Sequence, residues 1–156
     1  MKPGYLVLIV AFVLIAGGGW YYVRTHPTAP SNSTGLNPGA SPYAYRNASG
    51  DTITVDTPQA GAVVGKSFSV LGHARGAWFF EASFPVEVVD GNGTIIATAV
   101  AHTDANWMTN DFVPFKADLM VPTSYIGPAT VVLKKDNPSG DVANDASLSY
   151  PITVQY

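Results

Sequence analysis

The carboxy-terminal two thirds of the chain alternates apolar and polar residues with a period of two. The pattern is clearest in residues 113–121 (VPFKADLMV) and 148–156 (LSYPITVQY). Successive side chains of a strand point to opposite faces, so each segment predicts a half-buried antiparallel strand. Further short strands are predicted in the ranges 52–55, 68–74, 84–88, 94–100 and 129–133. No run of ten residues carries the apolar stripe of a helix.

Turn signals separate the predicted strands. Asp90-Gly91-Asn92-Gly93 predicts a hairpin turn, because these residues tolerate positive φ, and residues 136–140 predict another turn. About seven short strands in residues 49–156 predict an all-β fold, an immunoglobulin-like antiparallel β-sandwich. A small barrel is the alternative. Since the chain has no cysteine to link the sheets, large aromatic residues should fill the space between them. They are Trp78, Phe80, Phe84, Trp107, Phe112 and Phe115.

The amino-terminal region, residues 1–24, is unlike the rest. Its apolar run, residues 4–23, contains no charge, and a lysine precedes it while an arginine follows it. As a helix, about 20 residues span roughly 30 Å, the thickness of the hydrocarbon core of a bilayer. Three aromatic residues cluster at its far end, as at a membrane interface. We therefore expect one transmembrane helix, a retained signal anchor in the lipid bilayer. A cleaved signal peptide is the alternative.

Residues 25–48 are rich in Pro, Ser, Thr and Asn, and prolines stand at positions 27, 30, 38 and 42. This composition predicts an extended, flexible linker. Two of its residues, Tyr43 and Tyr45, can dock against the folded domain. The three parts together predict a single-pass protein of the cell membrane. The linker places the carboxy-terminal domain outside the cytoplasm.

Charge and composition exclude several classes of function. The absence of cysteine excludes thiol catalysis and cysteine-ligated zinc. Residues 49–156 carry eleven acidic and five basic side chains, a formal charge of −6, which disfavours nucleic acid as a partner. His73 and His102 have no metal-ligand spacing. Residues 90–94 resemble the start of a calcium loop, but its twelfth position is Ala101 rather than Glu, so the hairpin explains them better. We expect no metal and no cofactor.

Two acids and several aromatic residues are the candidates for a site. Glu81 and Asp111 each stand beside bulky aromatic residues. They could hold loops in place by accepting hydrogen bonds from backbone amides or from tryptophan N–H groups. Two carboxylates across one cleft could instead hydrolyse a glycoside. A third interpretation is a contact surface for a sugar polymer or a protein. Its candidate residues are Trp78, Phe79, Glu81, Trp107, Asn110 and Asp111.

Three strings carry a family resemblance: residues 76–86 (GAWFFEASFPV), 107–115 (WMTNDFVPF) and 136–140 (DNPSG). With them, residues 58–61 and 70–76 resemble the immunoglobulin-like domain of bacterial spore germination, one of the GerMN-associated domains. The resemblance covers residues 51–156. It implies an extracytoplasmic β-sandwich of the bacterial envelope that is not an enzyme and brings no catalytic residues. The expected function is interaction or scaffolding, with an unidentified envelope protein as partner. The alternative is binding of cell-wall glycan, or peptidoglycan, by exposed aromatic residues.

Overall fold

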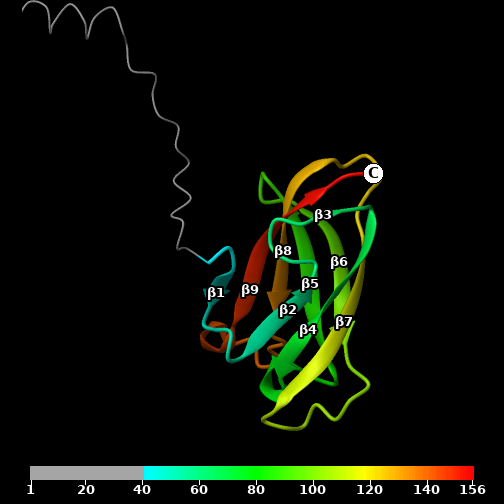
Figure 1. Cartoon of the computed structure of the whole chain (residues 1–156). Coiled ribbons are helices and arrows are strands. Elements are labelled where there is room, and N and C mark those ends of the chain that lie inside the picture. The colour runs from blue at the N-terminus through cyan, green and yellow to red at the C-terminus, as the bar shows by residue number, and fades with distance from the viewer. Residues whose placement is uncertain (1–40) are drawn as a thin grey trace, which may run out of the picture. The chain divides into compact units, whose positions relative to one another are not determined.

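The computed structural model describes residues 41–156, which form one compact unit (Figure 1). Two three-residue 3-10 helices, η1 and η2, interrupt the strands. The elements are β1 (Ala44–Arg46), β2 (Ile53–Thr57), β3 (Val63–Val64), β4 (Ser67–Arg75), η1 (Gly76–Trp78), β5 (Ser83–Asp90), β6 (Ile95–His102), β7 (Phe112–Met120), β8 (Gly127–Lys134), η2 (Val142–Asn144) and β9 (Ser147–Val154). No helix within residues 41–156 is long and apolar enough to cross a membrane. The predicted span 4–23 and most of the predicted linker lie outside the described residues.

The strands form two facing layers. One layer contains β2, β4 and β7, and the other contains β6, β5, β8 and β9, with β1 and β3 on β9 (Figure 1). All of these pairs are antiparallel except β3 with β9. The layers are joined by a single residue pair, His102 with Lys116. Because β1 and β2 lie at the two ends of the strand order, the sheet does not close on itself. The predicted immunoglobulin-like β-sandwich is thereby confirmed.

The apolar positions of the alternating segments meet between the layers. In β7 the buried residues are Val113, Phe115, Ala117 and Leu119, and in β9 they are Leu148, Tyr150, Ile152 and Val154. Phe84 of β5 is fully buried at the centre of an aromatic cluster. Its ring centroid lies 4.9 Å from that of Phe115, 5.2 Å from Phe79 and 6.2 Å from Trp78, in edge-to-face contacts. Each such contact stabilises the fold by about 0.5–1.5 kcal/mol beyond the area that it buries.

All seven predicted strands are present, and two short ones, β1 and β3, were not predicted. β1 lies within residues 25–48, the range that the sequence suggested as linker, and the compact unit begins at Ser41 rather than at residue 49. The reason is Tyr43, whose ring centroid lies 5.5 Å from that of Tyr150 and whose hydroxyl donates to Gln59 Oε1 at 3.0 Å. Strands of two or three residues are too short to show a period.

The prediction of which aromatic residues fill the core was wrong in part. Trp78, Phe84 and Phe115 are buried and Trp107 is half-buried against the core, but Phe80 and Phe112 are 43% and 38% exposed. Phe79 is buried in place of Phe80. The alternation fails here because residues 76–78 form the 3-10 helix η1 and not a strand, so two successive rings turn inward.

Candidate functional site

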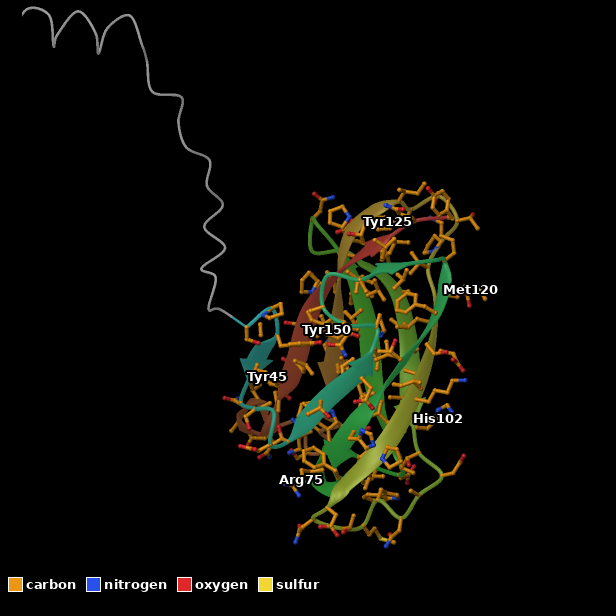
Figure 2. The ribbon with its side chains drawn as sticks, viewed as in Figure 1. Tyr45, Arg75, His102, Met120, Tyr125 and Tyr150 are labelled. Atoms are coloured by element: carbon orange, nitrogen blue, oxygen red, sulfur yellow. The ribbon has the colours of Figure 1, made fainter. Side chains whose placement is uncertain are left out.

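The connections that carry the family-like strings converge at one end of the sandwich. They are the β4–β5 connection (residues 76–82), the β6–β7 loop (103–111) and the β8–β9 loop (135–146). Figure 2 shows Arg75 at this end, where β4 finishes and β7 begins, and Met120 toward the opposite end. We call this region the loop end. Backbone hydrogen bonds tie its parts together: Asp136 N donates to Trp78 O at 3.1 Å, and Thr103 N donates to Ala82 O at 3.1 Å.

Arg75 is the polar centre of the loop end. Its Nε donates to Asp51 O and its Nη1 to Asn110 O, each at 2.9 Å. The guanidinium carbon lies 4.3 Å from the centroid of the Phe112 ring, which suits a cation–π contact. Phe112 remains partly exposed because it packs under this cation rather than in the core. Arg75 therefore fixes the start of β2 and the β6–β7 loop against the end of β4.

Gly76 allows the β6–β7 loop to approach η1. A Cβ atom added at this position would lie 2.0 Å from Thr109 O and 2.2 Å from Trp107 O. No side chain fits in that space, so the contact of the two connections requires glycine. The neighbouring residues Trp78 and Phe79 are only 3% and 5% exposed. The sequence placed both on a contact surface, whereas the structure places them in the core, where so little exposed area leaves a partner almost nothing to contact.

A shallow surface depression at the loop end brings together three of the six candidate residues. Its lining includes Phe79, Trp107 and Asn110, together with Met108, which is 76% exposed. Its volume is about 350 Å³. Trp107 is half-buried, so one part of its ring packs on the core while another part is accessible. The depression is formed by the backbone contact at Gly76 and not by a strand face.

The two candidate acids are exposed and do not form a catalytic pair in any contact of the described residues. Glu81 lies in the tight turn between Phe80 and Ser83, and Asp111 Oδ2 accepts a hydrogen bond from Thr109 Oγ1 at 3.3 Å. Neither acid accepts from a tryptophan, and Trp78 Nε1 is buried with no partner among residues 41–156. The expectation that tryptophan N–H groups bond to these carboxylates was therefore wrong. The loops are held instead by Arg75, which donates to the backbone carbonyl groups of Asp51 and Asn110.

The Asp90 carboxylate organises the predicted hairpin. Its Oδ1 accepts from the backbone N–H groups of Asn92 and Thr94, each at 2.8 Å, and these bonds, that to Thr94 foremost, lower the pKa of Asp90. The hairpin interpretation of residues 90–94 is confirmed. His73 and His102 are exposed strand residues, and His73 Nδ1 lies 3.1 Å from Asp56 Oδ2. Among residues 41–156 no three His, Asp or Glu side chains are placed to hold a metal ion.

A comparison with family models agrees with this arrangement. Residues 52–141 match the model of the immunoglobulin-like domain of bacterial spore germination, Gmad2. The chain belongs to this family. Domains of this family are not typically enzymes. No curated protein and no solved structure matches the chain.

Sequence reasoning missed three residues of the loop end: Arg75, Gly76 and Lys135. Arg75 and Gly76 directly precede the aromatic string, and a glycine between a strand and three large residues is a signal of close backbone approach. Lys135 had no comparable signal, because its place beside Trp78 depends on the path of the β8–β9 loop.

Proposed function

We propose that this chain is a non-catalytic interaction module of the bacterial cell envelope, and that its loop end is the contact surface. The observation that carries the proposal is the convergence of all three family-like strings at one end, joined by Arg75 and Gly76. Sandwich domains commonly recognise partners through loops that a rigid pair of sheets holds together at one end.

Backbone strain at the loop end supports the same conclusion. Glu81 and Ala82 have φ angles of 49° and 62°, in the left-handed region that favours glycine. Residues held in this region cost free energy and cluster at functional sites. The turn that exposes Glu81 therefore has a backbone conformation that stability alone would not select.

Membrane attachment completes the proposal. The uncharged run 4–23 supports an anchor in the lipid bilayer, and the polar residues that follow it support a domain held outside the cytoplasm. The exposed carboxylates Glu81 and Asp111, with no shared contact, support a role without catalysis. The partner is then an envelope protein, and a role in germination is the one that the family description suggests.

Binding of cell-wall glycan is the second candidate. It is favoured by Trp107, which is partly accessible and lines the depression together with Asn110. Sugar rings stack on aromatic faces while amide groups bond to their hydroxyls. The depression is shallow and contains only one tryptophan, so the protein partner is preferred.

Two single-cysteine variants test location and contact together, because the chain has no cysteine of its own. Met108→Cys lies at the loop end, and Met120→Cys lies at the other end of β7; the two side chains are 76% and 77% exposed, a matched pair. In intact cells, a maleimide that cannot cross the cytoplasmic membrane should label both. A photo-crosslinking maleimide should join a discrete envelope protein to the Met108 variant alone.

Failure of both variants to react in intact cells, with labelling after lysis, would contradict the location. Equal adducts at both positions, or none at Met108→Cys, would contradict the contact surface. Adducts to glycan strands at Met108→Cys, removed by muramidase, would favour the second candidate.

A further inference from the structure

Two open cavities lie at the loop end, and Trp78 lines the first of them. The first, of about 260 Å³, is lined by Trp78, Arg75 and Lys135 and by polar residues of the β8–β9 loop. The second, of about 350 Å³, is lined by Arg46, Lys134 and again Lys135. Lys135, Asp145 and Ala146 contribute to both linings, so the two cavities adjoin. They share the loop end with the depression that contains Trp107, and only Ala77 lines both that depression and the first cavity.

These cavities collect most of the positive charge of an acidic domain. Residues 41–156 contain six Lys and Arg residues against eleven acids, and four of the six line the two cavities. Two carboxylates, Asp136 and Asp145, also line them. A third, Glu87, pairs with Lys134 at 2.6 Å. Four cations against three carboxylates leave one positive charge without a partner. That balance fits a ligand with a single negative charge better than a phosphate monoester.

Lys135 is the cation most available to a ligand. Lys134 is neutralised by Glu87, and Arg75 already donates to two carbonyl groups and stacks on Phe112. Lys135 is half-buried, and its Nζ has only one contact among the described residues, with Asn144 O at 3.5 Å. A half-buried ammonium group binds an anion more strongly than an exposed one, because less water screens the pair.

Trp78 supplies the other half of a binding site. Trp78 lines the first cavity although it is only 3% exposed, and its Nε1 has no hydrogen-bond partner among residues 41–156. A buried donor without an acceptor costs about 1–3 kcal/mol, and such groups are rare in native proteins. The nitrogen exposes less than 1 Å² of surface, so an acceptor reaches it only if the cavity wall moves. Ala143 and Asn144 line the same cavity and are exposed.

We propose that these cavities bind a ligand that carries one carboxylate and a small apolar group. The Lys135 ammonium pairs with the carboxylate. When the exposed residues of the lining move aside, the Trp78 ring packs against the apolar group and Trp78 Nε1 donates to an oxygen of the ligand. The free carboxy terminus of a short peptide has this chemistry, whereas an acidic sugar carries the carboxylate without the apolar group. The site lies at the same loop end as the proposed contact surface, but its cavities differ from the depression that contains Trp107, and ligand binding there does not require a protein partner.

The test is a titration of the full-length chain in mild detergent. Binding is monitored by the NMR signals of the tryptophan indole N–H groups. The probes are acetyl-trialanine with a free carboxylate, its carboxamide, a glucuronic acid disaccharide and inorganic phosphate. Trp78→Phe assigns the Trp78 signal by its disappearance. We expect the peptide acid to shift that signal saturably, and the carboxamide to leave it unchanged. Tighter binding of the uronic acid than of the peptide acid would contradict the apolar contact with Trp78.

Removal of one charge provides the control. Lys135→Gln should weaken binding by about tenfold, the usual effect of losing a charge-assisted hydrogen bond. Lys116→Gln removes the same charge from β7, where Lys116 pairs with Asp118 at 2.9 Å outside both cavities, and should leave binding unchanged. The proposal is overturned if neither acid shifts the Trp78 signal, if acid and carboxamide bind equally, if phosphate binds more tightly than both acids, or if the two lysine variants behave alike.

Discussion

The two tyrosines that join β1 to β9 show how the same chemical group can have opposite effects on stability. The Tyr43 hydroxyl donates to Gln59 Oε1 at 3.0 Å and accepts from Ala60 N at 3.3 Å. The Tyr150 hydroxyl is buried and has no partner among residues 41–156. Burial, and secondarily the neighbouring Tyr43, raises the pKa of Tyr150 above its ordinary value. Tyr150 thus contributes its ring to the core at the expense of a desolvated hydroxyl.

Tyr150→Phe should increase the free energy of unfolding by about 1 kcal/mol at neutral pH, because it removes an unpaired buried hydroxyl. Tyr43→Phe should decrease it by about 1 kcal/mol, because it removes two hydrogen bonds. Urea denaturation measures both. Equal losses in the two variants would mean that the Tyr150 hydroxyl has a partner.

The raised pKa of Tyr150 also sets a pH dependence. In the unfolded chain the phenol ionises near pH 10, and in the folded chain it ionises at higher pH. Stability from this group is therefore complete below about pH 10 and is lost as pH rises above it. The alkaline loss should be smaller in Tyr150→Phe than in the unsubstituted chain.

Among the secondary-structure elements, the turn before β5 differs most from ordinary preferences. Phe80 and Ser83 exchange backbone hydrogen bonds of 3.0 and 3.1 Å across Glu81 and Ala82, and both central residues have positive φ. This is the geometry of a type I′ turn, which normally selects Asn-Gly. Glu-Ala fits that geometry poorly, because a Cβ atom crowds the backbone at positive φ.

The double substitution Glu81→Asn with Ala82→Gly should therefore stabilise the domain by about 1 kcal/mol. Ala105→Gly, in the exposed β6–β7 loop where φ is not positive, is the control, and it should be slightly destabilising through the entropy of the unfolded chain. Thermal unfolding of the double variant, the Ala105→Gly variant and the unsubstituted chain measures both effects. A lower melting temperature for the double variant would show that the turn is not strained.

At the scale of the whole molecule, the sandwich brings segments that are far apart in the sequence to one end. Arg75 at the end of β4 holds Asp51 and Asn110, and Asp136 bonds to Trp78. Gly76 is the point at which the β6–β7 loop meets η1. The shape of the loop end therefore depends on one residue without a side chain.

Gly76→Ala should destabilise the domain by about 1–3 kcal/mol, as overpacking does, and should increase hydrogen exchange in residues 103–111. Gly91→Ala is the matched control, because a Cβ atom added there meets nothing within 4 Å. The two substitutions should differ clearly in urea denaturation. If Gly76→Ala were as stable as Gly91→Ala, the β6–β7 loop would have to be free to move away from η1.

The sequence by itself determined the strands and the class of fold. Alternation in residues 113–121 and 148–156 fixes which face of each strand is buried, because side chains of a strand point to alternate faces. The Asp90 hairpin could also be predicted from the sequence, because the hydrogen bonds of this turn join residues at most four positions apart.

Only the tertiary structure decided which side chains form the surface of the loop end. Trp78 and Phe79 turn into the core because η1 is not a strand, and Tyr43 joins the sheet through a partner more than a hundred residues away. Lys135 lines the same cavity as Trp78 because of the course of the β8–β9 loop. Periodicity describes a regular backbone, whereas these contacts depend on irregular connections that take their shape from one another.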